Sequence, residues 1–138
     1  MTSRTLISRS GLVRSLLIVF AVLLVSPAQA HHNMTAVFDF SDRVTVKGTL
    51  TTVDWRNPHT YFTVEAKSDA GAIESWQIEG PSPSFFRIRD VGKPDFEDSV
   101  GKSVTVELSR ARDKSRSGLI RTFTLANGKI VSACPQNC

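Results

Sequence analysis

Short runs of β-branched and aromatic residues, separated by turn-forming residues, make up most of this 138-residue chain. Such runs predict β-strands, and a single stretch has the apolar spacing of a helix. The expected strands cover residues 44–55, 61–66, 73–79, 104–108 and 119–125. The sequence therefore predicts a mainly β fold.

In the first expected strand, the apolar residues lie on one face at the start and on the opposite face at the end. Val44 and Leu50 lie in one phase of the alternation, whereas Val53 and Trp55 lie in the other. A phase change inside one strand calls for a bulge, and Gly48 offers a point at which the strand can bend. A long, bent first strand suits a sheet that curls over itself.

One short helix is expected between the third and fourth strands. In the segment Gly80-Pro81-Ser82-Pro83, Ser82 can cap a helix and Pro83 suits its first position, while Gly92 can close its end. Three strands, a helix and two strands are the element order of the oligonucleotide/oligosaccharide-binding (OB) fold. We therefore expect a small OB-like five-stranded barrel, with a split β-sandwich or an open barrel as alternatives. Residues from Ala126 on can add one short hairpin edge.

The first thirty residues have the layout of a secretory signal peptide. Arg4, Arg9 and Arg14 precede an apolar run of ten residues, and Ala28-Gln29-Ala30 is a small-x-small cleavage site. The run is too short to span a bilayer, which takes about 20 residues. We therefore expect cleavage after Ala30, export to the periplasm and no stable membrane insertion of the mature protein.

Cleavage would leave residues 31–133 as a single domain and residues 134–138 as a cysteine-containing tail. Cys134 and Cys138 can form a local disulfide, pair with another chain or bind metal, and the sequence leaves these alternatives open. The signal removes three of 17 basic residues and none of the 13 acidic ones, so the mature chain is nearly neutral. A nearly neutral exported domain has no electrostatic reason to bind nucleic acid. We expect a monomer.

The three histidines of the chain are the candidate metal ligands. Cleavage would give His31 a free α-amino group, next to His32, and His59 lies in the loop after the first strand, which in OB folds is on the ligand-binding side. The amine and imidazole of His31 could meet His59 around one ion, an arrangement that resembles the histidine brace of copper proteins. Ligation by several nitrogens favours copper as Cu(II), with zinc as the alternative.

The loop around His59 also contains candidate ligand-binding residues. Asn57 and Pro58 form its turn, and Trp55 and Tyr61 bracket it with aromatic rings that can shield a ligand or belong to the core. The alternative function is a metal-free module that uses this loop to bind a small molecule or a periplasmic protein. Catalysis is the least favoured function, because the chain has no Gly-rich phosphate loop and no nucleophile elbow.

Three motifs of the expected mature chain occur together. They are the initial His31-His32, the stretch Phe38-Asp39-Phe40, and a W-x-N-P-H motif from Trp55 to His59. With them the chain resembles a family of small exported bacterial proteins, mostly from proteobacteria, that is classed as a domain of unknown function. The resemblance implies an exported small β domain and points to the histidines and Asn57 as functional positions. It implies no reaction and names no ligand.

Overall fold

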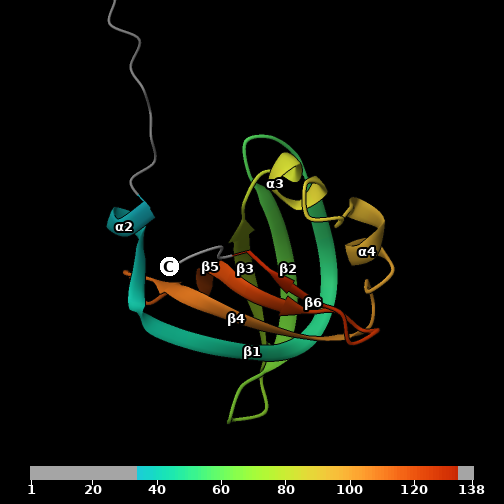
Figure 1. Cartoon of the computed structure of the whole chain (residues 1–138). Helices are drawn as coiled ribbons and strands as arrows, with labels where there is room; N and C mark the ends of the chain where they lie inside the picture. The colour runs from blue at the N-terminus through green and yellow to red at the C-terminus, as the bar shows by residue number, and fades with distance from the viewer. Residues whose placement is uncertain (1–33, 134–138) are drawn as a thin grey trace, which may run out of the picture. The chain divides into compact units, whose positions relative to one another are not determined.

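The computed structural model of the protein describes residues 34–133. Within this part, six strands form one sheet, accompanied by three short helices (Figure 1). The strands are β1 (Phe38–Trp55), β2 (Thr60–Lys67), β3 (Ile73–Gly80), β4 (Ser103–Ala111), β5 (Ser117–Thr124) and β6 (Ile130–Ser132). The helices are α2 (Met34–Val37), α3 (Pro83–Arg87) and α4 (Lys93–Glu97). The mainly β prediction is confirmed.

Several expectations concern residues outside this range. The expected signal peptide, His31, His32, Cys134 and Cys138 all lie outside the described residues. Between residues 34 and 133, no helix combines the length and the apolar character needed to cross a membrane.

The pairings among the first five strands run in a ring. β1 pairs antiparallel with β4 through residues 38–49 and with β2 through residues 49–55. The β2–β3 and β4–β5 pairs are also antiparallel, and residues 77–79 of β3 pair in parallel with residues 117–119 of β5. The sheet therefore continues from β1 through β2, β3, β5 and β4 back to β1.

The sheet has six strands in the described chain, one more than the five expected for the barrel. The sixth strand, β6, is the hairpin edge that the sequence allowed after Ala126, and it pairs with the end of β5. Gly128 has a positive φ of 85°, and the Leu125 N–H donates to the Lys129 carbonyl, which turns the chain back on β5. The tight turn adds a strand too short to stand out as an apolar run.

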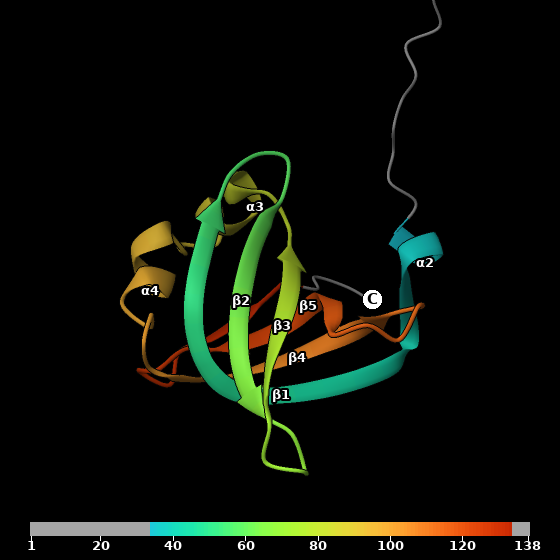
Figure 2. The same ribbon diagram turned by 180° about the vertical axis from the view of Figure 1, so that it is seen from behind.

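β1 is long and strongly curved, and it passes from β4 to β2 (Figures 1 and 2). The register between β1 and β2 shifts between Leu50 and Thr52, where the apolar phase also changes, in agreement with the expected bulge. Gly48 lies just before this shift. A Cβ atom there would stand 2.1 Å from the backbone oxygen of Glu65, so this close approach of β1 to β2 requires glycine.

Two short helices, and not the single one expected, separate β3 from β4. The first begins as predicted, because the Ser82 hydroxyl accepts a backbone N–H of α3 and Pro83 opens the helix. Gly92 does not end that helix but caps the start of α4, where its N–H donates to the Asp95 carboxylate at 2.8 Å. Asp90, with a positive φ of 55°, interrupts the helical path between the two.

The two helices pack on the sheet through a cluster of phenylalanine rings. Phe86 of α3 and Phe96 of α4 are fully buried, together with Phe62 of β2 and Phe123 of β5. The Phe96 ring centroid lies 4.7 Å from that of Phe62 and 5.3 Å from those of Phe86 and Phe123. These are the separations of contacting aromatic pairs. Phe96 thus stands at the centre of the cluster.

Asp95 joins α4 to the turn between β5 and β6. Its carboxylate lies 2.7 Å from Lys129 Nζ and accepts the Gly92 N–H. The bond from Lys129, followed by that from Gly92, lowers the pKa of Asp95 below its ordinary value of 3.8. A lowered pKa in the folded state means that this carboxylate stabilises the fold above the ordinary value, and that the stabilisation is lost as the pH falls through the folded-state pKa.

We therefore expect Asp95→Asn to lower the free energy of unfolding at pH 7 by about 1 kcal/mol. The difference from the wild type should shrink at pH 3, below the ordinary value of 3.8, because the unfolded chain then takes up a proton that the folded carboxylate resists. Urea unfolding at pH 7, 5 and 3 measures both effects. Glu97→Gln, in the exposed pair with Lys93, is the control and should change stability little. An Asp95→Asn effect that is equal at all three pH values would contradict the assignment.

Candidate functional site

The loop between β1 and β2 carries Asn57, Pro58 and His59. The Asn57–Pro58 peptide bond is cis, and both residues are exposed. Immediately after the loop, the Thr60 hydroxyl and backbone N–H both donate to the Pro81 carbonyl, at 2.9 and 3.2 Å. These bonds tie the loop to the chain that leaves β3, so His59 lies next to the end of that strand.

His59 contacts Glu79 of β3. His59 Nδ1 contacts Glu79 Oε1, and the two side chains are only 25% and 20% exposed. Glu79 is also the cross-strand partner of Tyr61. The structure therefore brings together two residues singled out in the sequence, His59 and Tyr61, around a carboxylate that the sequence analysis missed. The alternation of β3 places Glu79 on the outer face, but only the hairpin register sets it beside this loop.

Tyr61 lies beside the pair and below Arg56. The Arg56 guanidinium carbon is 5.4 Å from the centre of the Tyr61 ring, and Arg56 Nε also contacts Asp54 at 3.1 Å. Burial, and after it the negative charge of Glu79, raises the pKa of the Tyr61 hydroxyl. The phenol is therefore protonated at neutral pH and can donate a hydrogen bond to a ligand.

A small pocket of about 190 Å³ adjoins Tyr61 and Glu79. Its lining comes from the start of the described chain, the β2–β3 hairpin and the start of β5: Val37, Phe38, Tyr61, Gln77, Glu79, Ser117 and Gly118. The end of α2 and the carboxylate that binds His59 therefore border the same depression.

Trp55, the remaining candidate ligand-binding residue, packs on the two helices. Its ring stacks on Phe86 with centroids 5.3 Å apart and contacts Phe96 at 5.6 Å. The side chain is partly exposed at the edge of the core. The structure thus gives Trp55 a packing role, and contact with a ligand stays a prediction, as it does for Asn57 and Pro58.

In residues 34–133, no group of three or more His, Cys, Asp or Glu side chains is arranged to hold a metal ion. Of the three histidines, the described chain contains His59 alone. Its contact with Glu79 has the form seen in many metal centres, where a ligating histidine uses its other ring nitrogen to bind a carboxylate. The described part can therefore supply one imidazole ligand with its supporting carboxylate.

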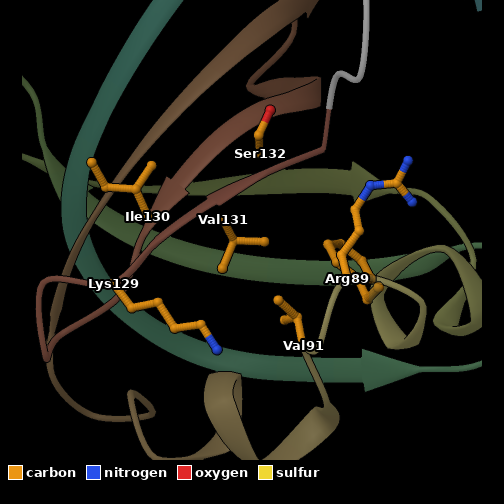
Figure 3. A pocket seen from close by; sticks show the side chains of 7 residues that line it. Arg89, Val91, Lys129, Ile130, Val131 and Ser132 are labelled. Atoms are coloured by element: carbon orange, nitrogen blue, oxygen red, sulfur yellow. The ribbon is translucent and has the colours of Figure 1, made fainter.

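A second pocket, of about 490 Å³, lies between β6 and the chain that follows α3 (Figure 3). Arg89 and Lys129 flank Val91 and Val131 there. Arg89 donates to a backbone carbonyl of α3, and Lys129 binds Asp95. Both cationic groups thus serve the local structure, and the pocket includes none of the candidate site residues.

These features define a small, mainly β domain with a histidine–carboxylate pair beside a small pocket. A family model described as a family of unknown function (DUF6152) matches residues 20–122. The chain therefore belongs to this family, and the resemblance to a family of unknown function is confirmed. No curated protein and no solved structure matches the chain.

Proposed function

We propose that the protein is an exported, periplasmic binding module that holds copper through His59 and through His31 at the start of the mature chain. The observation that carries the proposal is the contact between His59 Nδ1 and Glu79. A carboxylate at one ring nitrogen orients the imidazole and makes it more basic as a ligand. Since Nδ1 binds Glu79, Nε2 is the nitrogen that would bind the ion.

The proposed fold is an OB-type barrel. The ring of pairings through β1, β2, β3, β5 and β4 supports it, as does the position of α3 and α4 between β3 and β4. β6 is an addition at the edge of β5. In this fold class the β1–β2 loop borders the ligand, which supports a site at His59.

His31 is the proposed second ligand because it is close in sequence to residues that border Glu79. Val37 and Phe38 line the same pocket as Glu79. After cleavage at Ala30 only three residues would precede Met34, and three residues span at most about 11 Å. The new α-amino group and the His31 imidazole could then close a chelate ring, with His32 as a further ligand or a supporting group. A nitrogen-rich set favours Cu(II), with zinc as the alternative.

The test is a copper titration of mature protein whose first residue has been verified by mass spectrometry. We expect one Cu(II) per chain, and a loss of affinity of about 100-fold or more in His59→Ala and in a form extended by one residue at the N-terminus. Glu79→Gln should lose about 10- to 100-fold, the usual effect of removing a supporting group. Glu65→Gln, on the exposed part of β2, is the matched control. Full affinity in the extended form would contradict chelation by the amine.

The copper affinity should also depend on pH. Protons compete for the lone pairs of the amine and the imidazoles between about pH 6 and 8, so the affinity should fall as the pH drops through this range. Titrations at pH 6, 7 and 8 measure the change. An affinity that stays constant over this range would exclude amine and imidazole ligands.

A second candidate is a metal-free module that binds a small organic molecule or a periplasmic protein at the same edge. The 190 Å³ pocket beside Tyr61 favours it, because the protonated phenol and the apolar wall of Val37 and Phe38 suit a small group with one hydrogen-bond acceptor. The same titration separates the two candidates, since this one requires that neither copper nor zinc binds to the mature protein.

A further inference from the structure

We propose that the 190 Å³ pocket beside Tyr61 binds a small amino alcohol, whose ammonium group pairs with Glu79 and whose oxygen accepts the Tyr61 hydroxyl proton in a hydrogen bond. The amino alcohol is the ligand of the metal-free module, so the assignment rests on that second candidate function. Every residue that lines the pocket lies between positions 37 and 118, within one compact unit of the described chain.

Strand register places the polar groups of the pocket on one face of the sheet. Tyr61 of β2 is the cross-strand partner of Glu79 on β3, so the two side chains project from the same face. Gln77 lies two residues before Glu79 on that face, and it pairs in parallel with Ser117 of β5. Three neighbouring strands thus contribute polar side chains to the same depression.

Glu79 supplies the charge of the pocket, since the other described side chains that line it are uncharged. A carboxylate has about four acceptor sites, so Glu79 can contact His59 and a ligand together. A neutral imidazole donates from Nδ1 without cancelling the negative charge. Arg56, which lies over the Tyr61 ring, is balanced by Asp54 at 3.1 Å. A ligand in the pocket therefore meets a negative charge, which favours a cation.

The remaining lining selects the rest of the ligand. The Tyr61 hydroxyl can donate to one oxygen. Val37 is 47% exposed beside the buried Phe38, so carbon atoms placed against them remove apolar surface from water. A cavity of roughly 150 Å³ holds one benzene molecule, so this pocket has room for about five to eight heavy atoms. A short carbon chain with an ammonium at one end and a hydroxyl at the other meets all three conditions.

The experiment compares three probes of nearly equal size by NMR titration of the metal-free mature protein. Aminopropanol carries both polar groups, butylamine replaces the hydroxyl by a methyl group, and butanol replaces the ammonium by a methyl group. We expect shifts of the amide signals of residues 61, 77, 79 and 117, which line the pocket. Relative to aminopropanol, the affinity should be about fivefold lower for butylamine and about tenfold lower for butanol, the effects of losing a neutral and a charged hydrogen bond.

Two variants assign each contact to its residue. Tyr61→Phe removes the hydroxyl alone, so aminopropanol should lose its advantage over butylamine. Glu79→Gln keeps the shape of the side chain but removes the charge, so aminopropanol should lose its advantage over butanol. Glu65→Gln, on the exposed part of β2, is the matched control and should bind all three probes as the wild type does. Thermal unfolding verifies the fold of each variant.

Three results would overturn the assignment: no binding of any probe, equal affinity of the wild type for all three, or preferences that persist in both variants. A copper titration of the same sample keeps the two proposals apart. Copper binding without aminopropanol binding would overturn the pocket ligand and leave the copper site intact. Aminopropanol binding to a protein that binds neither copper nor zinc would support the ligand and the metal-free module together. Binding of both would support the pocket ligand and overturn the metal-free module.

Discussion

Replacement of Phe96 by alanine is expected to lower the free energy of unfolding by about 4 kcal/mol. The Phe96 ring is fully buried and contacts the rings of Phe62, Phe86, Phe123 and Trp55. It is also the buried residue through which α4 packs on the sheet. A helix of five residues is not stable alone, so loss of this ring leaves a cavity and releases α4.

Urea unfolding of the mature protein at pH 7 measures this loss. Phe96→Leu keeps an apolar side chain in the site and should give an intermediate loss, which remains measurable if the alanine variant does not fold. Ile88→Ala is the exposed control, since Ile88 is 78% exposed and its removal should change stability by no more than about 0.5 kcal/mol. Similar values for Phe96→Ala and Ile88→Ala would show that the ring cluster is not the core.

Gly48→Ala is expected to cost about 3 kcal/mol, although it adds a single methyl group. The new Cβ would lie 2.1 Å from the Glu65 oxygen and 2.8 Å from the Glu65 carbonyl carbon. Both are backbone atoms, so the strain is relieved only if β1 moves away from β2. The move would open the sheet where β1 leaves β4 and joins β2.

Thermal and urea unfolding of Gly48→Ala test this, with Gly71→Ala as the control. Gly71 has a positive φ of 81°, and a Cβ there would meet nothing within 4 Å. Its cost should therefore be conformational alone, about 1 to 2 kcal/mol, and Gly71→Asn should recover much of it. A smaller loss for Gly48→Ala than for Gly71→Ala would contradict the close approach of the two strands.

The strand pattern predicted the central elements well. Residues 61–66 and 73–79 were expected as strands and form most of β2 and β3. Side-chain alternation is a local property, so it can be read without knowledge of the fold. The start of β1 was missed by six residues, because the chain from Phe38 to Arg43 pairs irregularly with β4 and lacks a regular alternation.

The helical segment shows a different limit. Ser82 and Pro83 mark the start of α3 through contacts within one turn, and this start was predicted. The end was not, because Gly92 suits either a helix end or a helix start. The carboxylate of Asp95 and its contact with Lys129, far along the chain, make Gly92 the cap of α4.

In the candidate site, His59 and Tyr61 were predicted from the sequence because they lie near the turn that Asn57 and Pro58 predict. Glu79 was not predicted as a site residue. An acidic residue on the outer face of a strand is common, and it indicates a site only when its neighbours in the fold are known. The β2–β3 register supplies that neighbour, and the Thr60 bonds to Pro81 bring His59 to it.

Neighbouring residues alone thus specify the positions of most strands, the β1–β2 turn and the first turn of α3, because each depends on alternation or capping within a few residues. Contacts between distant segments specify the rest: the parallel pairing of β3 with β5, the Glu79 carboxylate at His59, and the hold of Arg112 on Thr35 across 77 positions. No local pattern encodes these contacts. The first forms because the curved sheet brings β3 and β5 together, the second follows from the β2–β3 register, and the third lies beside the pairing of Phe38 with Ala111.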